Sequence, residues 1–164
     1  MSYPHRLDAI EYSGYHLFSL TIATFGRARH FSNPSVVDMV WSQFLRAAGA
    51  EGYAVLAYCF MPDHVHMVVA GSRDSANLRR FVSAAKQAAG FAFARSFGGR
   101  LWQLNFFDRT IRRSDDLAAI IGYMLLNPVR ASIVDELHQY PYWGSQLYSR
   151  NELLEFVGAS SRRR

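Results

Sequence analysis

The sequence predicts an α+β domain of the split βαβ type, in which an antiparallel sheet carries helices on one face. Half of the residues are hydrophobic, which excludes a disordered chain. Strand-like and helical patterns follow in the order strand, helix, strand, strand, helix, strand, helix. With 164 residues we expect one domain over 1–164, with an N-terminal arm over about 1–12 and a flexible basic tail over about 158–164.

The first third of the chain predicts a strand followed by a helix. Hydrophobic residues alternate with small or polar ones over 14–25, which is typical of a strand with one buried face. The buried face carries Phe18, Leu20 and Ile22, and the other face carries Ser19, Thr21 and Ala23. Asn33 as N-cap and Pro34 at the first helical position predict the start of the helix. We expect this helix to end at Gly49.

A hairpin comes next, formed by two strands over 52–61 and 64–71. The first of these strands is apolar on both faces, which indicates a central position in the sheet. The segment 61–63 between them contains a proline, which cannot donate to a central ladder, and is therefore expected to be a turn. We expect the second strand to run antiparallel to the first.

The second half of the chain predicts two further helices with a strand between them. A long helix with one basic side is expected from Asp74 to about Phe97, and the fourth strand over 100–111. Ser114 is expected to cap the last helix. That helix should end at Pro128, because proline disfavours the helical conformation in the residue before it.

Charge and cysteine content indicate the kind of partner and the cellular compartment to expect. The formal net charge of +5 favours a polyanionic partner, of which nucleic acid is the commonest. The single cysteine, Cys59, excludes a disulfide framework within one chain. The N-terminal segment has no apolar run of the signal-peptide type, and no apolar run has the length of a membrane span. We therefore expect a soluble, cytoplasmic protein.

Two histidines stand one residue apart in the third predicted strand. A period of two places His64 and His66 on one face of the strand, away from the core residues Val65, Met67 and Val69. Two imidazoles on one strand face can reach one metal ion or one phosphate. Each can also be an ordinary surface or core histidine, so a metal site would need a third ligand.

The last predicted helix offers candidates for the missing groups. Tyr123 and Asn127 are four residues apart, so they are neighbours on one side of the helix. The amide oxygen of Asn127 is a hard ligand that suits Mg²⁺ or Mn²⁺, and a tyrosine can act as a covalent nucleophile. The ordinary alternatives are a tyrosine packed by its ring and an asparagine that ends a helix.

Basic and aromatic residues are candidates for nucleic-acid contacts. The candidates for phosphate binding are Arg79, Arg80, Lys86, Arg109, Arg112, Arg113 and Arg130. Of these, Arg112 and Arg113 are the strongest, because they directly precede the last helix; the alternative for each residue is a solvated surface charge. Trp102, Phe106 and Phe107 are candidates for stacking on bases, although core packing is the favoured alternative.

Two other classes of protein share parts of this pattern. A histidine-triad nucleotide hydrolase would need a third alternating histidine, and Val68 occupies that place. An RNA-binding domain with the same order of elements would carry aromatic residues on the open face of the sheet, where this chain has histidines.

Three segments together carry a resemblance to a known family: AYCFMPDHVHMVV at 57–69, GRLWQLNFFDRTI at 99–111 and YMLLNPVRASIV at 123–134. They resemble the signature blocks of the REP-associated tyrosine transposases. These are small relatives of the single-tyrosine transposases in the His-hydrophobic-His endonuclease superfamily. The resemblance extends from about Tyr15 to Tyr148, and the combination of MPDHVH with YxxxNPVRA is specific.

The resemblance implies a ferredoxin-like domain with its active site on the sheet face opposite the helices. It implies a divalent metal, Mg²⁺ or Mn²⁺, held by His64, His66 and Asn127, with Tyr123 as the nucleophile. Two positions depart from the family pattern. Asp63 stands where an Asn is usual, which brings an extra carboxylate near the metal, and Gly122 stands where a larger, often basic residue is common.

The resemblance also implies a substrate and a reaction. The expected protein is a bacterial enzyme that cleaves and rejoins single-stranded DNA at hairpins of the repetitive extragenic palindrome type. The reaction would pass through a covalent 5′-phosphotyrosine intermediate, in a monomer or a homodimer. The alternative is a domain of the same fold that binds such hairpins without cutting them.

Overall fold

The computed structural model describes residues 15–162, so the predicted arm over 1–12 lies outside the described range. Within this range one sheet has the strand order β4-β1-β3-β2-β5, and every pair of neighbouring strands is antiparallel. The strands are β1 (Leu17–Ala23), β2 (Tyr53–Met61), β3 (His64–Gly71), β4 (Phe107–Ile111) and β5 (Trp143–Gly144). The hairpin of β2 and β3 at the centre of the sheet is as predicted.

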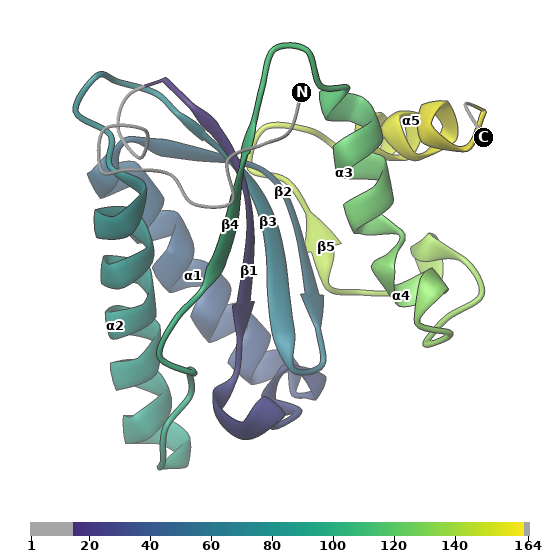
Figure 1. The fold of residues 1–164 in the computed structure, drawn as a ribbon. Coiled ribbons are helices and arrows are strands. Elements are labelled where there is room, and N and C mark those ends of the chain that lie inside the picture. The colour runs from purple at the N-terminus through teal and green to yellow at the C-terminus, as the bar shows by residue number, and fades with distance from the viewer. Residues whose placement is uncertain (1–14, 163–164) are drawn as a thin grey trace.

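Helices lie on both sides of this sheet, as Figure 1 shows. They are α1 (Pro34–Glu51), α2 (Leu78–Phe97), α3 (Leu117–Leu125), α4 (Asn127–Arg130) and α5 (Arg150–Ser161). The order of the first six main elements, βαββαβ, is that of the split βαβ fold, so the predicted fold class is confirmed. None of the helices between residues 15 and 162 has the length and apolar character that crossing a bilayer requires.

The main core lies between the sheet and the pair α1 and α2. Alternation brings one face of β1 and one face of β3 into this core, because successive side chains of a strand point to opposite sides. The buried strand residues are Phe18, Leu20 and Ile22 of β1 and Val65, Met67 and Val69 of β3, as predicted. Phe44 of α1 and Phe81 of α2 meet edge to face above them, with ring centroids 6.2 Å apart.

The opposite face of the sheet is divided into an apolar half and a polar half. Strand β2 presents Ala57, Cys59 and Met61, which α3 and α5 cover with Ile121, Met124, Leu125 and Leu153. Strands β1 and β4 present Ser19, Thr21, Phe107 and Arg109 on the same side. Helices, which the sequence predicted on one face only, therefore cover part of the second face as well. Because β2 is apolar on both faces, it requires a cover on each side of the sheet.

Three helix boundaries differ from the predictions. Helix α1 passes through Gly49 and ends at Gly52, whose φ of 77° is left-handed. Helix α2 begins at Leu78 rather than near 74, because the side chain of Asn77 accepts a hydrogen bond from the backbone N–H of Arg80 and so caps the helix. Helix α5 continues to Ser161, into the segment predicted to be a flexible tail.

The segment that leads into α3 also differs. Strand β4 covers only Phe107–Ile111 of the predicted 100–111, and Trp102 pairs with Thr24 as an isolated bridge. Asp116, not Ser114, caps α3 by accepting a hydrogen bond from the backbone N–H of Ala119 at 3.0 Å. Only Leu126 separates α3 from the short helix α4. Pro128 lies in the first turn of α4, where a proline is tolerated.

The two glycines at the end of α1 give a stability test. Gly52→Ala should lower the free energy of unfolding by roughly 1–2 kcal/mol, since an L-residue is strained in the left-handed region. Its added Cβ would also lie 2.6 Å from Nε of Arg73. Gly49→Ala should instead raise the free energy of unfolding by about 0.5–1 kcal/mol, because Gly49 is helical and exposed. Urea denaturation measures both, and a stabilising Gly52→Ala would contradict the observed helix end.

Candidate active site

The two histidine rings of β3 face each other. Their Nε2 atoms are 3.0 Å apart, and the ring planes are almost perpendicular, at 89°. Nδ1 of His64 is hydrogen-bonded to Oδ1 of Asp63 at 2.6 Å, and Nδ1 of His66 to Oγ1 of Thr21 at 2.9 Å. When both Nδ1 atoms donate in these bonds, both Nε2 atoms present lone pairs to the same point in space. A cation between the two Nε2 atoms favours this pair of tautomers, whereas a proton on one Nε2 atom would make the contact a hydrogen bond.

The surroundings keep His66 neutral. Burial, as the largest cause, and the neighbouring charges of His64, Arg130 and Arg27 together lower the pKa of His66 to about 4. An imidazole with so low a pKa keeps a free lone pair at neutral pH, which is the form that binds a metal ion. His66 is therefore prepared to act as a ligand rather than as a cation.

The spacing of the two Nε2 atoms fits two neighbouring ligands of a divalent metal ion. Neighbouring ligands on an octahedral ion with bonds of about 2.1 Å lie about 3.0 Å apart, the distance between the two Nε2 atoms. Asp63 and Thr21 are hydrogen-bond partners of the kind that orient metal-binding histidines. Among residues 15–162, no group of three His, Cys, Asp or Glu side chains could hold a metal ion, so a third protein ligand would have to be of another type.

Asp63 ties His64 to the loop after β1. Its Oδ2 accepts a hydrogen bond from Nε of Arg27 at 2.9 Å, and its Oδ1 holds His64. Burial acts to raise the pKa of Asp63, but the hydrogen bond and charge of His64, together with Arg27, outweigh it, so the pKa lies below its ordinary value. The charged carboxylate is a stronger hydrogen-bond acceptor than a neutral amide would be.

The break between α3 and α4 sets the direction of the Asn127 side chain. Pro128 has no N–H to donate to the carbonyl of Met124 four residues earlier. The side chain of Asn127 takes over this role, with Nδ2 donating to the Met124 carbonyl at 2.9 Å. Its Oδ1 consequently points the other way, where it accepts a hydrogen bond from Nη2 of Arg130 at 2.7 Å. A carbonyl oxygen has two lone pairs, so one remains for a metal.

Arg130 also orders the tyrosine. Its guanidinium carbon lies 3.6 Å from the centre of the Tyr123 ring, and Nη1 donates to the backbone carbonyl of Tyr123. Tyr123 is 52% exposed, although the guanidinium of Arg130 covers one face of its ring. A single arginine therefore holds both residues that the sequence pattern placed on one side of the helix.

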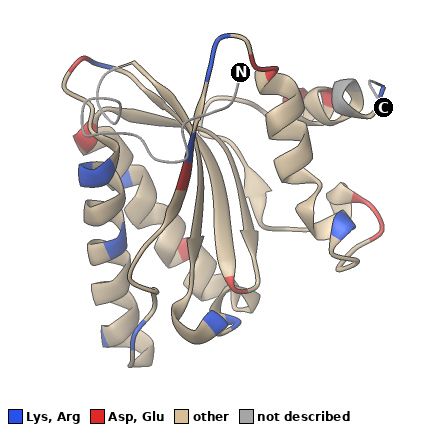
Figure 2. Ribbon diagram, in the orientation of Figure 1, with Lys and Arg blue, Asp and Glu red and all other residues tan. Residues whose placement is uncertain are grey.

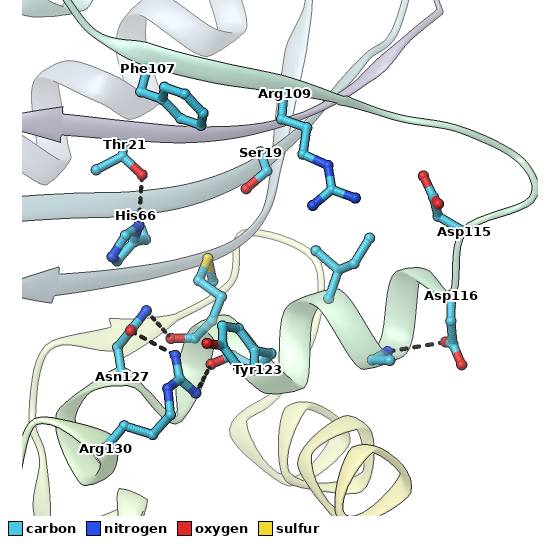
Figure 3. A pocket seen from close by; sticks show the side chains of 13 residues that line it. Ser19, Thr21, His66, Phe107, Arg109, Asp115, Asp116, Tyr123, Asn127 and Arg130 are labelled. Atoms are coloured by element: carbon cyan, nitrogen blue, oxygen red, sulfur yellow. Dashed lines mark hydrogen bonds between the residues drawn. The ribbon is translucent and has the colours of Figure 1, made fainter. Parts of the chain in front are cut away.

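These groups meet at a cavity of about 620 Å³ between the polar half of the sheet and α3, shown in Figure 3. Its wall includes three of the four predicted catalytic and metal-binding residues, His66, Tyr123 and Asn127, and His64 joins them through its contact with His66. Arg109 and Arg130 also line this cavity. The structure thus brings together side chains from β3, β4, α3 and α4, of which His66 and Asn127 are 61 residues apart in sequence.

The other predicted phosphate contacts are scattered. Lys and Arg residues lie along α2, in the loop before α3 and near α4, as Figure 2 shows. Arg79, Arg80 and Lys86 belong to α2, which packs on the sheet face opposite the cavity. Arg80 pairs with Glu51 at 3.3 Å, and Nζ of Lys86 donates to three backbone carbonyls of residues 103–105. Arg112 and Arg113 lie in the loop directly before α3.

Two residues of the site were missed from the sequence: Thr21 holds His66, and Arg27 holds Asp63. Phe107, a candidate for stacking on bases, lines the cavity with 67% of its surface exposed. A signal existed for Thr21, because alternation already put it on the side of the first strand that faces away from the core. Arg27 had none, since its contact depends on how the loop after β1 folds onto the β2–β3 turn.

Comparisons with known proteins give the family and the fold. The family model of IS200-like transposases matches residues 13–124. A structure of a REP-associated tyrosine transposase bound to a REP hairpin has a TM-score of 0.71 and 17% identity, covering 87% of this chain and 82% of that one. A protein from Deinococcus radiodurans R1 described as a transposase has a TM-score of 0.52 and 22% identity, covering 76% and 91%. Among curated proteins there is no match.

The fold by itself does not define the chemistry. A bacterial tRNA(His) guanylyltransferase-like protein in complex with ATP has a TM-score of 0.52 and 13% identity, covering 94% of this chain and 74% of that one. Shared architecture at such low identity shows a common fold only. The family model is more specific, because it spans over half of the chain and includes both the histidine strand and Tyr123. The chain therefore belongs to the IS200-like transposase family of DNA-processing enzymes, and its fold is that of the REP-associated tyrosine transposase.

Proposed function

We propose that this chain is a metal-dependent endonuclease and strand transferase that acts on single-stranded DNA through Tyr123. The observation that carries the proposal is the convergence of Tyr123, Asn127 and His66 on one cavity, with His64 in contact with His66. A nucleophile, an amide oxygen and two imidazole nitrogens are the groups that phosphodiester transfer at a divalent metal requires.

The proposed reaction exchanges one ester for another. The hydroxyl oxygen of Tyr123 forms a bond to the phosphorus of a DNA phosphodiester, and the bond from phosphorus to the 3′ oxygen breaks. The proton lost by the tyrosine is balanced by the proton gained at the released 3′ hydroxyl. The number of phosphoester bonds is unchanged, so the 5′-phosphotyrosine link can be attacked by a 3′ hydroxyl and the strands rejoined. No nucleotide cofactor is needed.

The residues of the cavity have separate roles in this proposal. His64, His66 and Asn127 would hold Mg²⁺ or Mn²⁺, which when bound withdraws charge from a non-bridging phosphate oxygen. Arg130 keeps the Tyr123 ring in place beside Asn127. Arg109, which lines the cavity, and Arg112 and Arg113, in the loop before α3, would bind phosphates on either side of the reacting one.

The proposed substrate is a DNA hairpin of the repetitive extragenic palindrome type, and the support comes from the family and from the REP hairpin named for the structural relative. Such a substrate would place the protein with the chromosome in the bacterial cytoplasm. Helix α3 packs on the sheet and on α5 of its own chain, so one chain can supply all the proposed groups. This favours an active site formed by a single chain, either in a monomer or in each subunit of a homodimer.

Replacement of the nucleophile tests the chemistry. The protein should form a denaturation-resistant adduct with labelled single-stranded hairpin DNA in Mn²⁺ or Mg²⁺, and a chelator should abolish it. Tyr123→Phe should form no adduct, because it lacks the attacking oxygen. Tyr15→Phe is the matched control, since Tyr15 is another exposed tyrosine, at 67%, and should keep full activity. Hairpin binding without any adduct would favour the non-catalytic alternative.

Removal of the carboxylate behind His64 tests the metal site. Asp63→Ala should weaken Mn²⁺ binding about 10- to 100-fold, because the ring of His64 loses the partner that orients it. Electron paramagnetic resonance of free Mn²⁺ measures this without any DNA. Glu136→Ala is the control, since Glu136 holds His138 at 3.0 Å in the same way but on an exposed loop. Equal Mn²⁺ affinity in both variants would contradict the proposed site.

Replacement of one arginine on each side of the sheet tests which side binds DNA. Arg109→Gln should weaken binding of single-stranded DNA and reduce the slope of log affinity against log salt by about 0.7, as expected for one lost phosphate contact. Arg79→Gln should change neither, because Arg79 lies on α2 behind the sheet. Fluorescence anisotropy titrations at several salt concentrations measure both. A larger loss of DNA affinity in Arg79→Gln than in Arg109→Gln would contradict DNA binding on the cavity face of the sheet.

A further inference from the structure

We propose that Phe107 on β4 is a stacking platform for one unpaired base of the DNA strand that enters the cavity. The base would belong to a nucleotide next to the phosphate that Tyr123 attacks, so the inference rests on the proposed function. Nothing in the family match or the structural relatives assigns a role to this side chain.

The register of the sheet places Phe107 in line with the histidines. Thr21 of β1 is directly opposite His66 of β3 on one side and directly opposite Phe107 of β4 on the other. Directly opposed residues of antiparallel strands point to the same face of the sheet. Phe107, Thr21 and His66 therefore form one row across three strands, and all three line the cavity, as Figure 3 shows.

The length of this row suits one nucleotide. Neighbouring strands lie about 4.8 Å apart, so the backbones that carry Phe107 and His66 are about 10 Å apart. This is comparable to the distance from the phosphate of a nucleotide to the far edge of its base. A phosphate beside His66 and Tyr123 would consequently leave an attached or adjacent base within reach of the Phe107 ring.

Exposure separates Phe107 from the other two aromatic candidates. Trp102 is only 6% exposed and Phe106 packs against the main core, so both serve the fold. Phe107 is 67% exposed although it borders a cavity of about 620 Å³. A phenyl ring in that position contributes little to the core, but it offers a flat apolar surface to a base.

The neighbours of Phe107 provide the charge that a DNA strand needs. Arg109 follows two residues later on the same face of β4, directly opposite Ser19 of β1. Both line the same cavity, so a cation and a hydroxyl lie one row beyond the Phe107 ring. A DNA strand that passes from Phe107 to Arg109 along β4 would have a base over the Phe107 ring and a phosphate near Arg109. The base must be unpaired, because a base inside a duplex already stacks on both faces.

The test uses Tyr123→Phe as the parent protein, so binding is measured without chemistry. Fluorescein-labelled dT12 and an abasic twelve-unit oligomer of the same charge are titrated by anisotropy at one fixed salt concentration. Phe107→Ala should weaken dT12 binding about 5- to 150-fold and leave binding of the abasic oligomer unchanged. Phe107→Tyr should retain the parent affinity for dT12.

Phe91→Ala is the matched control, because Phe91 is 65% exposed but lies on α2 behind the sheet. It should bind dT12 as tightly as the parent. Three outcomes would overturn the inference: no measurable binding of dT12 by the parent, equal affinity of the parent and Phe107→Ala for dT12, or an equal loss on both oligomers. Since the parent lacks the nucleophile, failure of Tyr123 chemistry would not alter these results.

Discussion

Strand β2 is apolar on both faces, and the rest of the structure depends on the need to cover both. Helices α1 and α2 bury one side, and α3 with α5 buries Ala57, Cys59 and Met61 on the other. Beyond β3 the cover reaches only Leu17 of β1 and Ile111 of β4, because these strands otherwise present Ser19, Thr21 and Arg109 to the cavity. The boundary between the covered and the open half therefore runs along the strand that carries His64 and His66, and the last turn of α3 lies beside it.

Local constraints then set the direction of each functional group. Asp63 and Thr21 bind the Nδ1 atoms of the two histidines and turn their Nε2 atoms toward each other. The missing N–H of Pro128 leaves a carbonyl that Asn127 satisfies with its amide nitrogen, so its oxygen faces Arg130. The site is thus held by ordinary hydrogen-bond requirements of a strand and of a broken helix.

Periodicity in the sequence predicted the strands, the buried faces and the pairing of β2 with β3, because alternation is a local property. It also predicted that His64 and His66 lie on one face of a strand, and that Tyr123 and Asn127 lie on one side of a helix. The end of α1 was predicted at Gly49 instead of Gly52, since a glycine inside a helix and one at its end look alike in sequence. The contact of Arg27 with Asp63 and the exposure of Phe107 could not be predicted, because both depend on how distant segments pack.

We propose that the facing histidine nitrogens and the amide of Asn127 surround one cation beside Tyr123. Anomalous diffraction at the manganese edge from a crystal grown with Mn²⁺ tests it most directly. We expect a single strong peak about 2.1 Å from Nε2 of both His64 and His66, on the side of the cavity that Asn127 and Tyr123 line. A manganese ion bound elsewhere, with the two imidazoles free of metal, would contradict it.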